Sequence, residues 1–66
     1  MAVVKVIEIL SESSNGWEGA VQEAVSEASK TIDNIQSVYL ENLQAIVEND
    51  KIVNYRVNCK ISFVVK

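Results

Sequence analysis

The chain has 66 residues and a formal net charge of −3, with 48% hydrophobic residues, one cysteine and no histidine. This length allows a single domain spanning residues 1–66, which buries only about 60% of its unfolded surface and is marginal as a lone monomer. One cysteine excludes a disulfide framework, and the lack of histidine excludes Cys/His zinc sites and Ser–His or Cys–His catalytic pairs. Partner subunits are therefore the expected source of additional stability.

The distribution of charge and hydropathy along the chain indicates which partners and which compartment to expect. The six cations are spread along the sequence and form no basic patch, so we expect no nucleic-acid partner. No apolar stretch reaches the roughly 20 residues that span a bilayer, and the N-terminal residues show no signal-peptide cleavage site, so we expect no membrane association. These features predict a cytoplasmic protein with a reduced Cys59.

Residues 2–10, AVVKVIEIL, are rich in β-branched side chains and predict a strand. Neither face is cleanly polar, because apolar residues occur on both parities: Val3, Ile7 and Ile9 beside Lys5, and Val4, Val6 and Leu10 beside Glu8. A strand of this kind packs against something on both sides. In so short a chain, the second partner is expected to be another subunit.

Residues 11–16, SESSNG, predict a loop, and Asn15 lies three residues before Glu18 in a spacing typical of a capped helix start. Residues 17–32 then predict the single helix. Its apolar stripe has helical period and consists of Trp17, Ala20, Val21, Ala24, Val25, Ala28 and Ile32. We interpret Trp17 as a core anchor.

Residues 35–47 predict a second strand whose apolar face switches near Glu41–Asn42, which indicates a β-bulge. Residues 48–51, ENDK, predict a hairpin turn. Residues 52–65 predict a long strand with one buried face, because Val53, Tyr55, Val57, Cys59, Ile61, Phe63 and Val65 alternate with mostly polar residues. The predicted fold class is α+β in the order β-α-β-β, a three-stranded antiparallel sheet covered by one helix.

Catalytic and metal signatures are weak. No two of the carboxylates are paired by their spacing, so we interpret them as solvated surface and expect no enzyme. Cys59 falls on the apolar parity of the last strand and is interpreted as a core residue. Arg56 falls on the polar parity, which leaves two interpretations: a solvated sheet face, or an interface or cavity where it binds carboxylate or phosphate. A metal site formed by carboxylates meeting on a symmetry axis is also compatible with the sequence.

The whole chain resembles the dodecin family. The resemblance rests on KVIEI at residues 5–9, WEGAVQEAV at 17–25, the join Asp33–Asn34–Ile35, and YRVNCKISF at 55–63. It implies a bent three-stranded sheet around one helix and a homododecameric hollow shell that stores a small ligand, with the flavins FMN, FAD or riboflavin as family ligands.

Two family positions differ in this chain. Flavin-binding dodecins stack the flavin ring on a tryptophan, whose matching position is Ser37, and hydrogen-bond the ring edge with a glutamine, whose matching position is Arg56. Because serine has no π face, flavin binding is expected to be weak or absent. The pair Tyr55–Arg56 is similar to the subgroup called calcium dodecins, which implies Ca²⁺ or a purely structural shell as the alternative; the metal ligands are unassigned.

Overall fold

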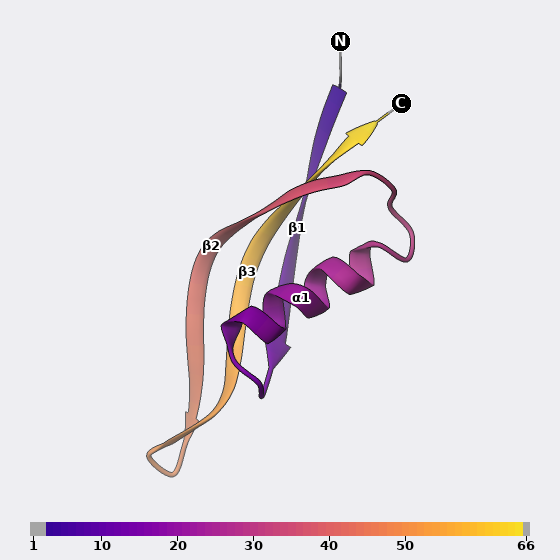
Figure 1. Ribbon diagram of the computed structural model, residues 1–66. Helices are drawn as coiled ribbons and strands as arrows, with labels where there is room; N and C mark the ends of the chain where they lie inside the picture. Colours follow the sequence, from indigo (N-terminus) through magenta and orange to yellow (C-terminus); the bar gives the residue numbers. More distant parts are fainter. Residues whose placement is uncertain (1–2, 66) are drawn as a thin grey trace.

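A computed structural model describes residues 3–65. Its elements are β1 (Val3–Ser13), α1 (Trp17–Ala28), β2 (Ile35–Glu48) and β3 (Lys51–Val65). The strands form one antiparallel sheet in the order β1-β3-β2. The connection from β1 through α1 to β2 therefore passes over β3, and β1 and β2 lie at opposite edges of the sheet (Figure 1). The predicted α+β class, the element order and the sheet are confirmed.

The core lies between α1 and the centre of the sheet. Ala20, Ala24 and Ala28 recur every four residues along the helix and are buried against Val57, Cys59 and Ile61 of β3. Because alanine has a short side chain, the helix lies close to the strand, in the hollow of the bent sheet (Figure 1). Flanking apolar residues complete this core, namely Ile7, Ile9, Val21, Val25, Ile32, Ile35 and Val38.

Strand β1 is longer than the sequence pattern predicts. The segment 11–13 continues the pairing with β3, where Ser11 lies opposite Val57, Glu12 opposite Arg56 and Ser13 opposite Tyr55. The predicted loop 11–16 was therefore wrong in its first half. Strand pairing outweighed the low intrinsic strand preference of these short polar residues, because their neighbours on β3 supply backbone partners.

Both ends of the helix also differ from the prediction. The N-cap is Gly16 (φ 106°), with no side-chain cap hydrogen bond, so the predicted role of Asn15 was wrong. Gly16 has φ 106° and ψ 174°, a backbone conformation that essentially only glycine adopts, and this places the cap one residue later. The helix ends at Ala28 rather than at residue 32. Just after this end, the Ser29 hydroxyl donates a hydrogen bond to the Ser26 carbonyl, and the backbone N–H groups of Lys30 and Thr31 bond to carbonyls three residues earlier, as in turns.

Strand β2 is irregular where the sequence indicated. Its register with β3 shifts between Leu40 and Asn42, which confirms the bulge predicted at Glu41–Asn42, and it shifts again at Ile35/Ser37 and Ile46/Val47. Asn49 and Asp50 form the hairpin turn with φ of 51° and 64°. Two positive φ values match the turn type that follows the natural twist of paired strands.

The chain is elongated, with principal extents of 51 × 20 × 13 Å and a radius of gyration of 13.5 Å. A compact domain of this length has a radius of gyration of about 11 Å. The tip of the β2–β3 hairpin extends beyond the start of α1, while the start of β1 and the end of β3 lie side by side at the opposite end (Figure 1). Within the described part of the chain, no helix is long and apolar enough to span a bilayer.

Candidate functional site

The sheet has one face covered by α1 and one face without a covering element, which we call the open face. Residues that lie directly opposite each other on paired strands share a face. Because Val57, Cys59 and Ile61 point to the helix, their alternate neighbours on β3 belong to the open face. Its central row consists of Arg56, Asn58, Lys60 and Ser62; β1 adds Val4, Val6, Glu8, Leu10 and Glu12; and β2 adds Ser37, Tyr39, Asn42 and Gln44.

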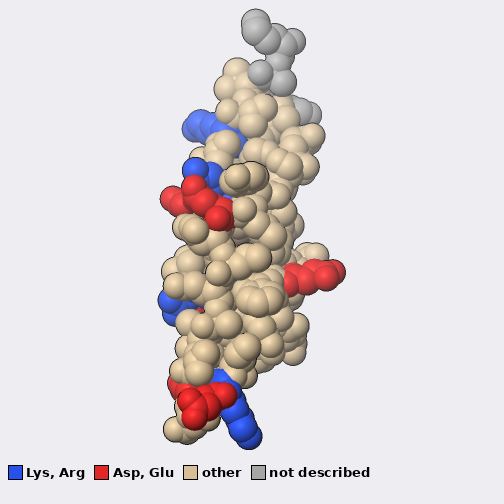
Figure 2. All heavy atoms as spheres, turned by 90° about the vertical axis from the view of Figure 1, so that its left-hand side faces the viewer, with Lys and Arg blue, Asp and Glu red and all other residues tan. Residues whose placement is uncertain are grey.

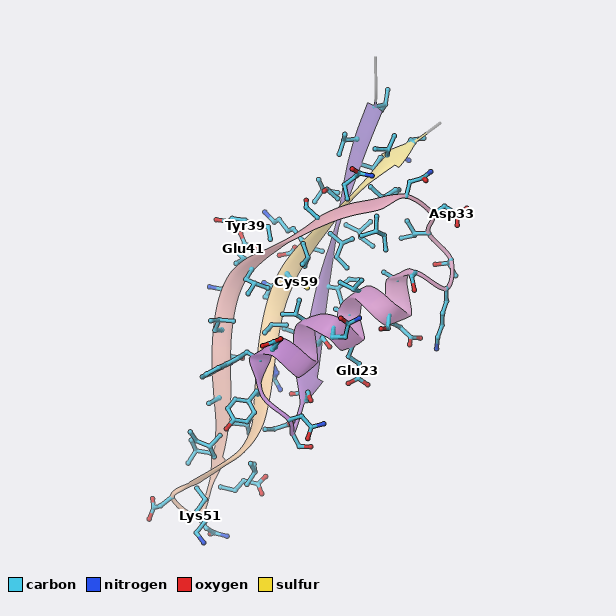
Figure 3. All side chains as sticks on the ribbon, viewed as in Figure 1. Glu23, Asp33, Tyr39, Glu41, Lys51 and Cys59 are labelled. Carbon is cyan, nitrogen blue, oxygen red and sulfur yellow. The ribbon has the colours of Figure 1, made fainter. Side chains whose placement is uncertain are left out.

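Ser37, the position predicted to replace the stacking tryptophan, is exposed on the open face near the start of β2. It lies opposite Ser62, and the two hydroxyl oxygens are 2.5 Å apart in a hydrogen bond. The aromatic ring nearest to it on the same face belongs to Tyr39, which is 66% exposed and projects from β2 away from the helix (Figure 3). Ser37 itself therefore offers a ligand a hydroxyl group and no ring.

Arg56, the second predicted position, is held from both neighbouring strands. Its Nε and Nη2 donate to Oε1 of Glu12 at 2.7 and 2.5 Å, and its Nη1 donates to Oε1 of Gln44 at 3.4 Å. Glu12 and Gln44 are its direct partners in the register of β1 and β2. The side chains of Arg56 and Glu12 are 35% and 41% exposed, so the pair is accessible from solvent.

The protomer does not bring Ser37 and Arg56 together. Ser37 lies opposite Ser62, which is six residues along β3 from Arg56. At about 3.3 Å per residue, the two positions are separated by up to about 20 Å on the same face. A single small molecule that touches both residues in one chain would have to span this distance.

The other face carries an aromatic pair at the start of α1. The rings of Trp17 and Tyr55 meet edge to face with centroids 4.9 Å apart, and the indole Nε1 of Trp17 donates to the carbonyl oxygen of Gln44 at 2.8 Å. Trp17 is 38% exposed, so it is not the core anchor that the sequence predicted. Ala20 is the first buried residue of the helix. Trp17 instead connects the start of the helix to the hairpin through its hydrogen bond to Gln44.

Cys59 is fully buried at the centre of β3, between the sheet and α1 (Figure 3). Its Sγ lies 3.5 Å from the carbonyl oxygen of Ile9. Burial raises the pKa of the Cys59 thiol above its ordinary value, because the thiolate would lose solvation. The predicted core role of this residue is confirmed.

Charged side chains are dispersed. Figure 2 shows small groups of both signs, separated by uncharged surface, on the face that looks toward β2. One of the ion pairs joins Lys60 of the open face to Glu41 at 3.3 Å. Within residues 3–65, no three Asp, Glu or Cys side chains converge into a metal-ligand group. The described part of one chain therefore does not by itself supply a carboxylate cage.

A shallow hollow of about 340 Å³ lies near the chain ends, between the segment after α1 and the end of β3. It is lined by Thr31, Ile32, Asp33, Asn34, Phe63, Val64 and Val65. Asp33 is the titratable residue of this lining, and neither Ser37 nor Arg56 contributes to it. The hollow is thus separate from the predicted site.

Glu12 and Gln44 are the site residues that sequence reasoning missed. Glu12 was assigned to a loop, although an antiparallel pairing of the first and last strands brings residue 12 beside residue 56. The available signal was an acidic residue on the same parity as Glu8, which would have required extending the strand past Leu10. The place of Gln44 depends on the bulge after Leu40, whose size the sequence does not define.

We compared the sequence with protein-family models and with curated proteins, and both comparisons find dodecins. The dodecin family model matches residues 3–66. A curated relative, "Calcium dodecin" of Mycobacterium tuberculosis, is 33% identical over 63 residues, covering 96% of this chain and 89% of that protein.

Solved structures agree with the fold. The crystal structure of calcium dodecin from M. tuberculosis, described as calcium chelating with a novel calcium-binding site, has a TM-score of 0.83 and 31% identity, with 97% of this chain and 91% of that chain covered. A mutant dodecin of T. thermophilus matches with a TM-score of 0.94 over 100% and 98% of the two chains. Its identity is 23%, so this likeness concerns the fold alone.

Proposed function

The chain belongs to the dodecin family, and we propose that twelve copies form a hollow shell that binds a small ligand on the open faces of their sheets. The observation that carries this proposal is the open face itself. It combines a polar central row with large apolar side chains that are exposed to solvent: Val4 and Val6 are 54% and 58% exposed, and Leu10 is 62% exposed. Such a surface on so small a domain is typical of an assembly.

The dimensions of the protomer support self-association. Its accessible surface is 4861 Å², whereas a folded monomer of 7.3 kDa typically has about 4,200 Å². At the hairpin, Val47 and Ile52 are 59% and 54% exposed directly opposite each other. Both edge strands are also free in one chain, and association would cover their apolar side chains.

We place the ligand between copies. Ser37 and Arg56 share the open face but lie too far apart to grip one small molecule within a chain. In a symmetric assembly, the same patch on two copies meets itself, so that Ser37 of one copy can approach Arg56 of the partner subunit. In this proposal, residues 1–66 form one domain, and both Ser37 and Arg56 bind the ligand.

Flavin is a poor fit to this site. The rings of Tyr55 and Trp17 are engaged with each other on the helix side, and Ser37 provides no π surface. Each aromatic stack contributes about 0.5–1.5 kcal/mol beyond the area that it buries, and a ring sandwiched between two side chains loses two of them here. We therefore propose weak or absent binding of FMN, FAD and riboflavin.

Calcium is the second candidate ligand. It is favoured by the relative named calcium dodecin, with which this chain shares 33% identity over nearly its full length. Because no acidic group of three converges within residues 3–65 of one chain, carboxylates of several copies would have to meet at a symmetry axis. A purely structural shell is the remaining alternative.

The proposed activity is storage without catalysis. The chain contains no histidine and so no Ser–His or Cys–His catalytic pair, and burial raises the pKa of the Cys59 thiol, which disfavours the nucleophilic thiolate. Cys59 is a free, buried thiol, which agrees with a reducing compartment, and we propose the cytoplasm.

The test is titration of the purified assembly with riboflavin and, separately, with CaCl₂ by calorimetry, after dialysis against a chelator. The proposal predicts a particle about twelve times the 7.3 kDa mass and no riboflavin heat at micromolar concentration. A calcium heat, together with a melting temperature that rises with added calcium, supports the second candidate. A monomer in sedimentation, or saturable turnover of a substrate, contradicts the proposal.

A further inference from the structure

We infer that Glu12 sets the ligand selectivity of the open face: it occupies the guanidinium of Arg56 and so weakens the binding of phosphate-bearing anions. This inference rests on the proposed function, because it assigns the open face as the ligand surface. It concerns a residue outside the two positions predicted from the sequence.

A guanidinium has five N–H donors in a fixed fork, which suits it to bind a carboxylate or a phosphate through two parallel bonds. In this chain, one edge of that fork, Nε and Nη2, already binds Oε1 of Glu12. A third donor, on Nη1, is directed to the side-chain oxygen of Gln44. A phosphate that approached Arg56 would find the preferred bidentate edge taken by a carboxylate of the same chain.

The pair is built into the sheet. Glu12 and Arg56 are direct partners of β1 and β3, and Gln44 is the partner of Arg56 on β2, so three adjacent strands align the three side chains in one row. Directly opposite positions have Cβ atoms about 5 Å apart. The register of the sheet therefore places the two side chains within reach of each other.

Charge adds to the effect of occupancy. A phosphate bound at Arg56 would lie within about 4 Å of the Glu12 carboxylate, and two like charges at this distance repel even in bulk water. Breaking an exposed ion pair of this kind lowers the binding constant of a competing anion by up to about fivefold. The repulsion between the anion and the Glu12 carboxylate lowers it by a similar factor. Together they should weaken anion binding by about five- to twentyfold. The donors of Arg56 that remain free still suit the oxygen of a neutral ligand.

The experiment measures binding of inorganic pyrophosphate by calorimetry to the full chain and three variants. We expect Glu12→Gln to bind pyrophosphate about five- to twentyfold more tightly than the wild type. The matched control is Glu8→Gln, which removes the same charge from the same face of β1, four residues away and opposite Lys60. We expect it to change the affinity by less than about twofold, as is usual for a screened surface charge. The double variant Glu12→Gln/Arg56→Gln should lose the gain.

Three results overturn the inference: undetectable or unchanged pyrophosphate binding in Glu12→Gln, an equal gain in Glu8→Gln, or a gain that persists in the double variant. Native mass spectrometry of the same samples separates this failure from failure of the proposed function. Glu12 and Arg56 pair within one chain, so the affinity change reports their contact whether or not twelve copies assemble. A particle of the wrong size contradicts the shell alone.

Discussion

Ser37 and Arg56 lie on the same face of the sheet, but Ser37 pairs with Ser62, six residues along β3 from Arg56. The two positions that we propose as ligand-binding are therefore separated within one chain. The hollow between the segment after α1 and the end of β3 includes neither of them. Each open face holds half of the proposed site, and a second copy has to supply the other half.

Restoring an aromatic ring at Ser37 should restore flavin binding. We expect Ser37→Trp to tighten riboflavin binding by about tenfold or more, because two stacks at about 0.5–1.5 kcal/mol each are regained. Quenching of riboflavin fluorescence measures the affinity. The control is Glu23→Trp, which adds the same ring at an exposed position of α1. Equal affinities of Ser37→Trp and the wild type would show that the ligand site is elsewhere.

The hairpin tip should be a subunit contact. We expect Ile52→Asp to shift the protein toward smaller species in native mass spectrometry, because Ile52 and Val47 form an exposed apolar pair that a neighbouring copy would bury, and a buried unpaired charge is costly. The control is Asn49→Asp, which adds the same charge in the adjacent turn and tolerates its positive φ. An intact twelve-subunit particle with Ile52→Asp would remove the tip from the interface.

Trp17 should contribute to stability through its hydrogen bond to the Gln44 carbonyl. We expect Trp17→Phe, which keeps an aromatic ring beside Tyr55 but has no N–H donor, to cost about 1 kcal/mol. For a domain of this size, that corresponds to a melting temperature lower by about 4–8 °C. Differential scanning calorimetry measures it. An unchanged melting temperature would mean that water satisfies the carbonyl equally well.

The buried thiol of Cys59 should make stability depend on alkaline pH. Since burial raises its pKa above the ordinary value of 9.0, the unfolded chain loses this proton first as the pH rises. The contribution of the thiol is therefore complete below pH 9.0 and is lost as the pH rises toward the pKa of the folded state.

The measurement is urea denaturation of the wild type and Cys59→Ala at about pH 8 and about pH 10. We expect the free energy of unfolding of the wild type to fall more steeply between these values than that of the variant. The variant is the control, since it keeps every other group that titrates in this range. Parallel losses in the two proteins would show that the thiol ionises equally in both states.

The parts of the fold that follow from side-chain periodicity were predictable. The alternation of β3 and the alanine stripe of α1 define the two surfaces that meet in the core, and the parity switch near Glu41 located the bulge of β2. The errors occur where pairing of the backbone with a neighbouring strand decides whether a segment is a strand or a loop. Polar residues 11–13 were assigned to a loop, yet the long β3 extends far enough to hold them as a strand.

The site was less predictable for the same reason. The polar parity of Arg56 placed it on the uncovered face, but its partner Glu12 depends on the register between the first and last strands, which involves residues 44 positions apart. The apolar pattern excludes a one-residue slip, which would move a whole set of side chains to the other face, but a two-residue slip keeps every side chain on its face, so the pattern alone does not define that register. The burial of Trp17 was misjudged because a helical stripe defines a direction and not how far the covering sheet extends.

Native mass spectrometry of untagged protein, with and without added riboflavin, tests the central claim most directly. We expect a particle of twelve chains whose mass does not change with riboflavin, and a small excess mass that a chelator removes if calcium is the ligand. A monomer or dimer would contradict the shell. Twelve chains that retain riboflavin would contradict the argument from Ser37, since flavin would then be held without the missing ring.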